Sequence, residues 1–159
     1  MPPEARSKPG GPGGPRLPGG MASARAHGYS GTPVAKKLGL RAASHVLLLD
    51  APQDFAALLE PLPTGVVFET QATAAVDIAH VFVTRSEDLA RYLHHLRASL
   101  RPDASLWVSW PKKSAKVPST VTEGGIRELA LPLGFVDVKV CAVSDVWSGL
   151  KLVVRRQLR

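Results

Sequence analysis

Two short segments of this chain are apolar on both faces, and they constrain the fold more than any other feature of the sequence. His45–Leu49 reads HVLLL, and residues 77–84 read DIAHVFVT. A strand that is apolar at successive positions, and not only at alternate ones, is typical of parallel sheets whose two faces are covered by helices. We therefore expect both segments to be interior strands of a mainly parallel sheet.

Further strand and helix signals surround these two segments. Residues 65–69, 105–110, 136–143 and 150–155 are predicted strands, the last two joined as a hairpin by the polar link between them. Four helices are predicted. The first is short and covers residues 34–38, and the second begins at Asp50 and Pro52 and ends at Pro61. The third is capped by Ser86 and carries an apolar stripe of leucines, and the fourth begins with a capping box of Thr120 and Glu123.

This order of elements predicts the fold class. Strands that alternate with helices form an α/β domain, and right-handed crossovers require a mainly parallel sheet with helices on both faces. The pattern resembles a Rossmann-like methyltransferase sheet trimmed by one βα unit and closed by a C-terminal antiparallel hairpin. The turn after the first strand reads LLLDAPQDF, without the glycines that let a nucleotide approach the backbone. The fold resemblance therefore does not bring the activity with it.

The composition favours anionic partners without pointing to a dedicated nucleic-acid binder. The formal net charge is +7 and the pI is about 10.0, but residues 1–27 hold four of the cationic residues against Glu4 alone. The remainder is only weakly basic, so nucleic acid is disfavoured as a partner without being excluded.

Cys141 is the single cysteine, which favours a reducing cytoplasm. No apolar run is long enough for a membrane span.

The chain is expected to divide into a tail and one domain. Residues 1–27 are rich in proline and glycine and are predicted to be disordered, because they cannot bury enough apolar surface to offset their chain entropy. Met21 directly follows the proline- and glycine-rich stretch of residues 1–20, so either Met1 or Met21 could be the true start, and we favour a start-site artefact over a basic tether. Residues 28–159 are expected to form a single α/β domain.

The candidate ligand site lies where strands meet cationic turns. Residues 106–113 read LWVSWPKK, and ligands of open α/β sheets bind beyond the carboxyl ends of the strands. A small phosphate-bearing ligand could be held there by cations beside a helix N-terminus. The candidate residues for this anion site are Asp50, Arg85, Ser86, Trp110, Lys112 and Lys113. For Lys112 and Lys113, a solvated basic turn is an equally weighted alternative.

Tryptophan and histidine residues admit more ordinary roles. Trp107 is expected in the core, on the sheet face opposite to Trp110. Trp147 and Ser148 are candidates for a protein-interaction surface, and His80 is expected to be a hydrogen-bonded core histidine. No HxxxH, CxxC or GxSxG spacing occurs, so no catalytic residue, metal ligand or cofactor is assigned.

Four blocks of the sequence resemble a family of short bacterial proteins classed as a domain of unknown function. The blocks read GYSGTPVAKKLG, LWVSWPKK, FVDVKVCAV and WSGLKLVVR, and they span nearly the whole chain after the tail. The resemblance implies a bacterial source and a compact single domain, with no assigned catalytic residues. Thr120 stands where related sequences are expected to have aspartate.

Three functions remain open on the sequence. The leading hypothesis is a non-catalytic domain that binds a small anionic or nucleotide-like ligand at the carboxyl edge of its sheet. A divergent methyltransferase-like enzyme is the first alternative, disfavoured by the missing glycine turn. A protein-interaction module that uses Trp147 and the hairpin is the second.

Overall fold

The computed structural model describes residues 31–159, and Val34–Arg159 form one compact unit. The predictions made for residues 1–27, and the question of Met1 or Met21, lie outside the described residues. The helices and strands are α1 (Val34–Lys37), β1 (His45–Leu49), α2 (Phe55–Leu58), β2 (Val67–Glu69), β3 (Ile78–Phe82), α3 (Ser86–Ser99), β4 (Ser105–Pro111), α4 (Glu123–Ala130), β5 (Phe135–Ala142) and β6 (Trp147–Val154). Short 3-10 turns follow β4, α4 and β6. Within residues 31–159, no helix has the length and apolar character of a membrane span.

The strands form one six-stranded sheet in the order β2-β1-β3-β4-β6-β5. The first four strands are parallel, and β6 is antiparallel to both β4 and β5. This confirms the predicted Rossmann-like class, with a mainly parallel sheet and a C-terminal antiparallel hairpin. The hairpin places β6 inside the sheet and β5 at its edge. The exposed charges of β5, Asp137 and Lys139, suit an edge strand because they oppose pairing with another chain.

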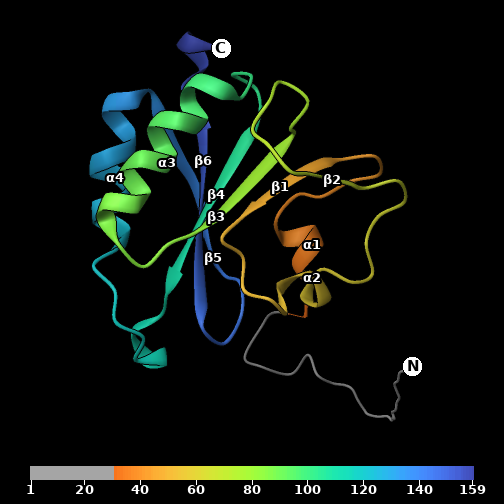
Figure 1. The fold of residues 1–159 in the computed structure, drawn as a ribbon, viewed down its shortest axis with the longest axis horizontal. Helices are drawn as coiled ribbons and strands as arrows, with labels where there is room; N and C mark the ends of the chain where they lie inside the picture. Colours follow the sequence, from red (N-terminus) through yellow and green to blue (C-terminus); the bar gives the residue numbers. More distant parts are fainter. Residues whose placement is uncertain (1–30) are drawn as a thin grey trace. The chain divides into compact units, whose positions relative to one another are not determined.

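Helices cover both faces of the sheet (Figure 1). α3 and α4 lie on one face, over a core that includes Leu106, Val108 and Leu150. α1 and α2 lie on the other face, over a core centred on Trp107 and Phe55. Successive residues of β4 thus point to opposite faces, and Trp107 is fully buried as predicted.

Three helix starts differ from the sequence prediction. α2 is a single turn, because Asp50 adopts a left-handed backbone (φ +56°) and the helix begins only at Phe55. Asp50 therefore does not cap it. Ser86 is the first helical residue of α3, not its cap, which is Arg85 in extended conformation. The cap of α4 is Thr122, whose hydroxyl accepts from Gly125 N at 3.0 Å. Thr120 does not cap α4, since its hydroxyl accepts from Ser86 N.

His80 confirms the expectation of a core histidine. It is 1% exposed in the centre of the sheet, its ring stacks on Phe82 at 4.3 Å, and its Nε2 lies 2.7 Å from Ser109 Oγ. Its Nδ1 has no hydrogen-bond partner in the described part of the chain. Burial lowers the pKa of His80 from 6.5 to about 3. The imidazole is therefore neutral in the folded protein at pH values where the unfolded chain is already protonated.

This pKa difference predicts that acid destabilises the fold through His80. Because the folded-state pKa lies below the unfolded value of 6.5, stability decreases as pH falls through 6.5 and continues to decrease toward the folded value. Between about pH 7 and about pH 5, this group alone should lower the free energy of unfolding by about 2 kcal/mol. Urea denaturation at both pH values measures the loss.

The control for this prediction is the double variant His80→Leu/Ser109→Ala, which removes both polar partners and leaves neither unsatisfied. Its loss of stability over the same pH range should be smaller than that of the wild type by about the same 2 kcal/mol. An identical pH dependence in the two proteins would contradict the assignment.

Candidate functional site at the carboxyl edge of the sheet

Parallel pairing of β1, β3 and β4 places the residues that follow these strands at one edge. Asp50 follows β1, Arg85 follows β3 by three residues, and Lys112 follows β4. β2 and β3 lie on opposite sides of β1, so the chain reverses its direction across the sheet at β1. In open α/β sheets, ligands bind outside the carboxyl ends of the strands at such a switch point. The edge between β1 and β3 is therefore the candidate site.

Asp50 is the polar group at this switch point. It is exposed, and its left-handed backbone turns the chain sharply out of β1. The hydroxyl of Tyr92, from α3, donates a short hydrogen bond to Asp50 Oδ2. Burial, together with the hydrogen bond to the Asp50 carboxylate, raises the pKa of Tyr92 to about 12. Tyr92 thus holds one carboxylate oxygen, while Oδ1 accepts no hydrogen bond from the described residues.

Tyr92 is not among the residues that the sequence predicts for a site, because the leucine stripe of the same helix indicates core packing alone. Tyr92 lies beside that stripe, next to Leu93, and packs against the same core. An amphipathic aromatic beside an apolar stripe keeps its ring against the core and its hydroxyl at a polar boundary. The position of Tyr92 beside the apolar stripe is therefore the sequence feature that could have indicated its role.

Arg85 and Ser86 are arranged differently from the anion-site prediction. The Arg85 guanidinium contacts Glu87 Oε2 at 3.3 Å, and both side chains are largely exposed. Ser86 N donates to Thr120 Oγ1 at 2.8 Å, and Ser86 Oγ donates to Thr120 O at 3.1 Å. The first amide of α3 is thus already satisfied by Thr120. The polar groups of Ser86 itself thus hold the loop before α4, and the expectation that the amides after Ser86 face an anion stays a prediction.

Lys112 and Lys113 lie where β4 ends. Lys112 N donates to Val146 O at 2.7 Å, which attaches this turn to the β5–β6 link, and Lys113 is exposed. Trp147 pairs in register with Pro111, and its ring meets Phe82 edge to face at 5.2 Å. The binding roles of Asp50, Trp110, Lys112 and Lys113, and the interaction roles of Trp147 and Ser148, stay predictions.

Trp110 and Trp147 lie on opposite faces of the sheet. Trp110 packs against the core under α3 and α4, whereas Trp147 packs against the core under α1 and α2. Both side chains are partly buried. They therefore do not form one stacking platform for a planar ligand.

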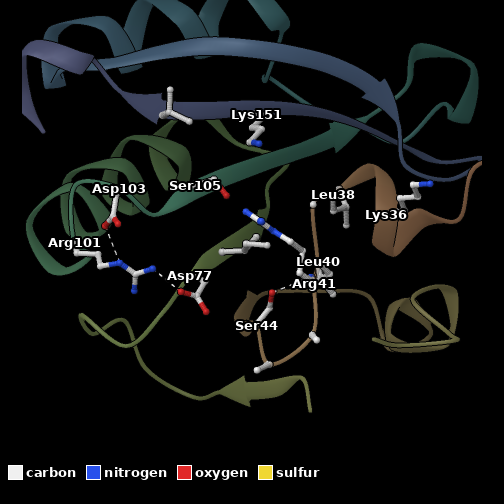
Figure 2. Close-up of a pocket in the computed structure, with 15 residues that line it drawn as sticks. Lys36, Leu38, Leu40, Arg41, Ser44, Asp77, Arg101, Asp103, Ser105 and Lys151 are labelled. Carbon is white, nitrogen blue, oxygen red and sulfur yellow. Dashed lines mark hydrogen bonds and ion pairs between the residues drawn. The ribbon is translucent and has the colours of Figure 1, made fainter. Parts of the chain in front are cut away.

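A pocket at the opposite, amino edge of the sheet was not predicted. Its volume is about 720 Å³, and it lies between the segment after α1, the starts of β3 and β4, and β6 (Figure 2). Lys36, Arg41 and Lys151 are the cationic residues of its lining besides Arg101, and the Lys36 side chain points away from the other two. The sequence prediction placed ligands only at carboxyl ends, and the spacing of these residues along the chain gave no sign that they meet.

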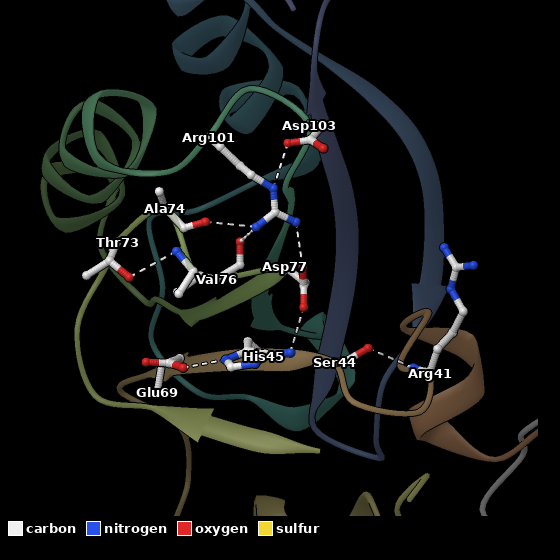
Figure 3. A network of polar contacts seen from close by, with 11 residues as sticks. Arg41, Ser44, His45, Glu69, Thr73, Ala74, Val76, Asp77, Arg101 and Asp103 are labelled. Atoms are coloured by element: carbon white, nitrogen blue, oxygen red, sulfur yellow. Dashed lines mark hydrogen bonds and ion pairs between the residues drawn. The ribbon is translucent and has the colours of Figure 1, made fainter. Parts of the chain in front are cut away.

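One side of this pocket is a closed network of polar contacts around Arg101 (Figure 3). Its guanidinium contacts the carboxylates of Asp77 and Asp103 and donates to the carbonyls of Ala74 and Val76 at 2.9 and 3.0 Å. Asp77 also accepts from His45 N at 2.7 Å. This backbone hydrogen bond, followed by Arg101, lowers the pKa of Asp77. The network fixes the loops that precede β3 and β4, and each of its charged groups has a partner of opposite charge.

Among residues 31–159, no three His, Cys, Asp or Glu side chains are grouped so that they could hold a metal ion. Cys141 is partly buried, and burial raises its pKa, which opposes a reactive thiolate.

Comparison with solved structures identifies the class of fold. The chain is similar to a SAM-dependent methyltransferase from Aquifex aeolicus, with 16% identity, a TM-score of 0.56, and coverage of 76% of this chain and 87% of that one. It is also similar to a possible exported protein from Bordetella parapertussis (11% identity, TM-score 0.55, 76% and 65% covered). A third neighbour is Aeropyrum pernix fibrillarin in complex with natively bound S-adenosyl-L-methionine (14% identity, TM-score 0.53, 80% and 71% covered).

These likenesses show a methyltransferase-like Rossmann fold. No family model and no curated protein matches the chain, so the resemblance to a bacterial family stays a prediction.

The switch point meets part of what S-adenosylmethionine requires. A carboxylate with an available oxygen stands at the end of β1, where it could accept from a ribose hydroxyl. The turn that follows, from Asp50 to Asp54, has no glycine, so side chains keep the ligand away from the backbone. The carboxylate that ends β2, Glu69, already contacts His45 Nδ1 at 2.6 Å. The residues therefore fit a nucleoside hydroxyl and do not fit a cofactor cradled by a glycine turn.

The contact between Asp50 and Tyr92 can be tested by titration. In a Tyr29→Phe background, where Tyr92 is the remaining tyrosine, ultraviolet absorbance should report a pKa of about 12 for Tyr92. Adding Asp50→Asn removes the negative charge and the strong acceptor, so the pKa of Tyr92 should decrease. An unchanged titration curve would show that Asp50 does not hold the hydroxyl.

Proposed function

We propose that this chain is a methyltransferase-like domain that binds an adenosyl ligand of the S-adenosylmethionine class at the switch point between β1 and β3. The observation that carries the proposal is Asp50. Its carboxylate lies where the chain reverses across the sheet, is held by Tyr92, and keeps Oδ1 available to a ligand hydroxyl. The fold likeness to proteins named for S-adenosylmethionine supports this choice of ligand.

The proposed site differs from the anion site predicted at the same edge. Ser86 N is occupied by Thr120, and Arg85 contacts Glu87, so two of the groups expected to bind phosphate have other partners. An acceptor carboxylate also suits a hydroxyl better than it suits a phosphate. A nucleoside hydroxyl is therefore favoured over a phosphate here.

Binding, and not methyl transfer, is the proposed activity. The turn after β1 has no glycine to bring a cofactor against the backbone, so the residues supply an acceptor for the ligand and no cradle for its reacting end. Transfer of a methyl group to an added acceptor would place the chain among the enzymes, which was the alternative drawn from the sequence.

Calorimetric titration with S-adenosylmethionine, S-adenosylhomocysteine and adenosine tests the proposal. We expect all three to bind, because they share the ribose hydroxyls. Asp50→Asn should weaken binding by about tenfold or more, since a hydrogen bond to a charged acceptor contributes about 1.5–3 kcal/mol. Asparagine tolerates a left-handed backbone, so the thermal melt of this variant should stay close to that of the wild type.

The matched control is Asp54→Asn. Asp54 is exposed in the same loop, makes no side-chain cap to α2, and undergoes the same change of charge. Its affinity for the three ligands should equal that of the wild type. Absence of binding at millimolar concentration, or equal losses in the two variants, would contradict the proposal.

A further inference from the structure

The pocket at the amino edge combines an apolar wall with cations drawn from three separate elements. Leu38, Leu40, Ile78 and Val153 supply apolar surface. Lys36 comes from α1, Arg41 from the loop that follows it, and Lys151 from β6 (Figure 2). The volume of about 720 Å³ lies within the range of about 300–1,000 Å³ that is usual for small-molecule sites.

The charges that line this pocket do not balance within the described residues. Arg101 is matched by Asp77 and Asp103, which leaves a small local excess of negative charge. The side chains of Lys36, Arg41 and Lys151 form no hydrogen bond or ion pair with any residue in the range 31–159. The lining as a whole is therefore cationic.

Lys151 is the most informative of the three. It is partly buried on β6, in register with Trp107 on β4 and with the cationic Lys139 on β5. Lys151 has no counter-charge among residues 31–159, and Lys139 adds a second cation on the neighbouring strand. An anion in the pocket would supply the missing counter-charge.

The wall opposite Lys151 is fixed before any ligand arrives. The indole N–H of Trp107 donates to Leu38 O at 3.0 Å in the buried core. Ser44 Oγ accepts from Arg41 N at 2.9 Å and thereby holds the backbone of the loop that carries the Arg41 side chain. A pocket that is already formed loses less conformational entropy when its ligand binds.

We propose that this amino-edge pocket binds a small molecule that carries a phosphate group on an apolar or aromatic body. Lys151 and Arg41 contact the phosphate oxygens, and the body lies against the apolar wall. The site is separate from the one under Proposed function and does not depend on it, since the two lie at opposite edges of the sheet.

Calorimetric titration with ATP, inorganic pyrophosphate and adenosine at low ionic strength tests this inference. ATP should bind more tightly than pyrophosphate, because only ATP has a body for the apolar wall. Lys151→Met should weaken ATP binding by about tenfold or more, the effect of losing one charge-assisted contact. Lys116→Met makes the same change in an exposed lysine beyond β4, at the other edge, and should leave ATP affinity within about twofold.

A second readout separates binding from a structural role. Without ligand, Lys151→Met should melt no lower than the wild type, because the variant replaces an unpaired, partly buried charge with an apolar chain of similar length. If this variant does not fold, Arg41→Gln, at the exposed rim, takes its place with the same expected loss of ATP affinity.

Three outcomes would overturn the inference: no ATP binding at millimolar concentration, equal loss of affinity in Lys151→Met and Lys116→Met, or ATP binding that is abolished by Asp50→Asn and insensitive to Lys151→Met. Adenosine distinguishes the two proposals. Binding of adenosine that depends on Asp50 and not on Lys151 supports the carboxyl-edge site alone, whereas ATP binding that depends on Lys151 and not on Asp50 supports the amino-edge site alone.

Discussion

Trp107 is fully buried at the middle of β4, and its indole N–H donates to the carbonyl of Leu38. This contact joins the segment after α1 to the centre of a sheet whose strands are distant from it in sequence. The core under α1 and α2 forms around the same tryptophan, together with Phe55 and Phe82. Without this hydrogen bond, a buried carbonyl and a buried N–H would both lack partners, which is unfavourable by about 1–3 kcal/mol for each group. The wall of the amino-edge pocket exists because this segment is held against the sheet.

The direction of the strands gives the two edges of the sheet different chemistry. At the carboxyl edge, β1 ends in Asp50, whose carboxylate accepts from Tyr92 and presents a second oxygen. At the amino edge, Arg101 pairs with the carboxylates of Asp77 and Asp103. The side chains of the other cationic residues there have no partner among residues 31–159: Lys36, Arg41 and Lys151. One edge thus offers an acceptor for hydroxyl groups, and the other offers donors for an anion.

The fold could be predicted from the sequence because its signals are local. HVLLL and the apolar run before Thr84 are buried on both faces, and burial of this kind requires the interior of a covered parallel sheet. The alternation of Trp107 and Trp110 between faces also follows from the two-residue period of a strand. Helix starts were predicted less well, because Thr120 and Ser86 bond to each other across the sheet edge and not to their own helices.

The sites were harder to predict because they depend on contacts between distant residues. Asp50 was identified as a candidate because it directly follows a predicted strand, but its partner Tyr92 is 42 residues away. The amino-edge pocket is lined by both Lys36 and Lys151, which are far apart in the sequence. They line one pocket because β6, the last strand, lies between β4 and β5 in the sheet. No spacing in the sequence encodes this insertion of the last strand.

Nuclear magnetic resonance can locate an adenosyl ligand directly. Two-dimensional amide spectra recorded during titration with S-adenosylhomocysteine report each backbone N–H separately. We expect the resonances that move to belong to residues 49–55 and 83–92, around Asp50 and Tyr92. Changes confined to residues 36–44 and 149–153, or no changes at millimolar ligand, would contradict the assignment of the carboxyl edge as the primary binding site.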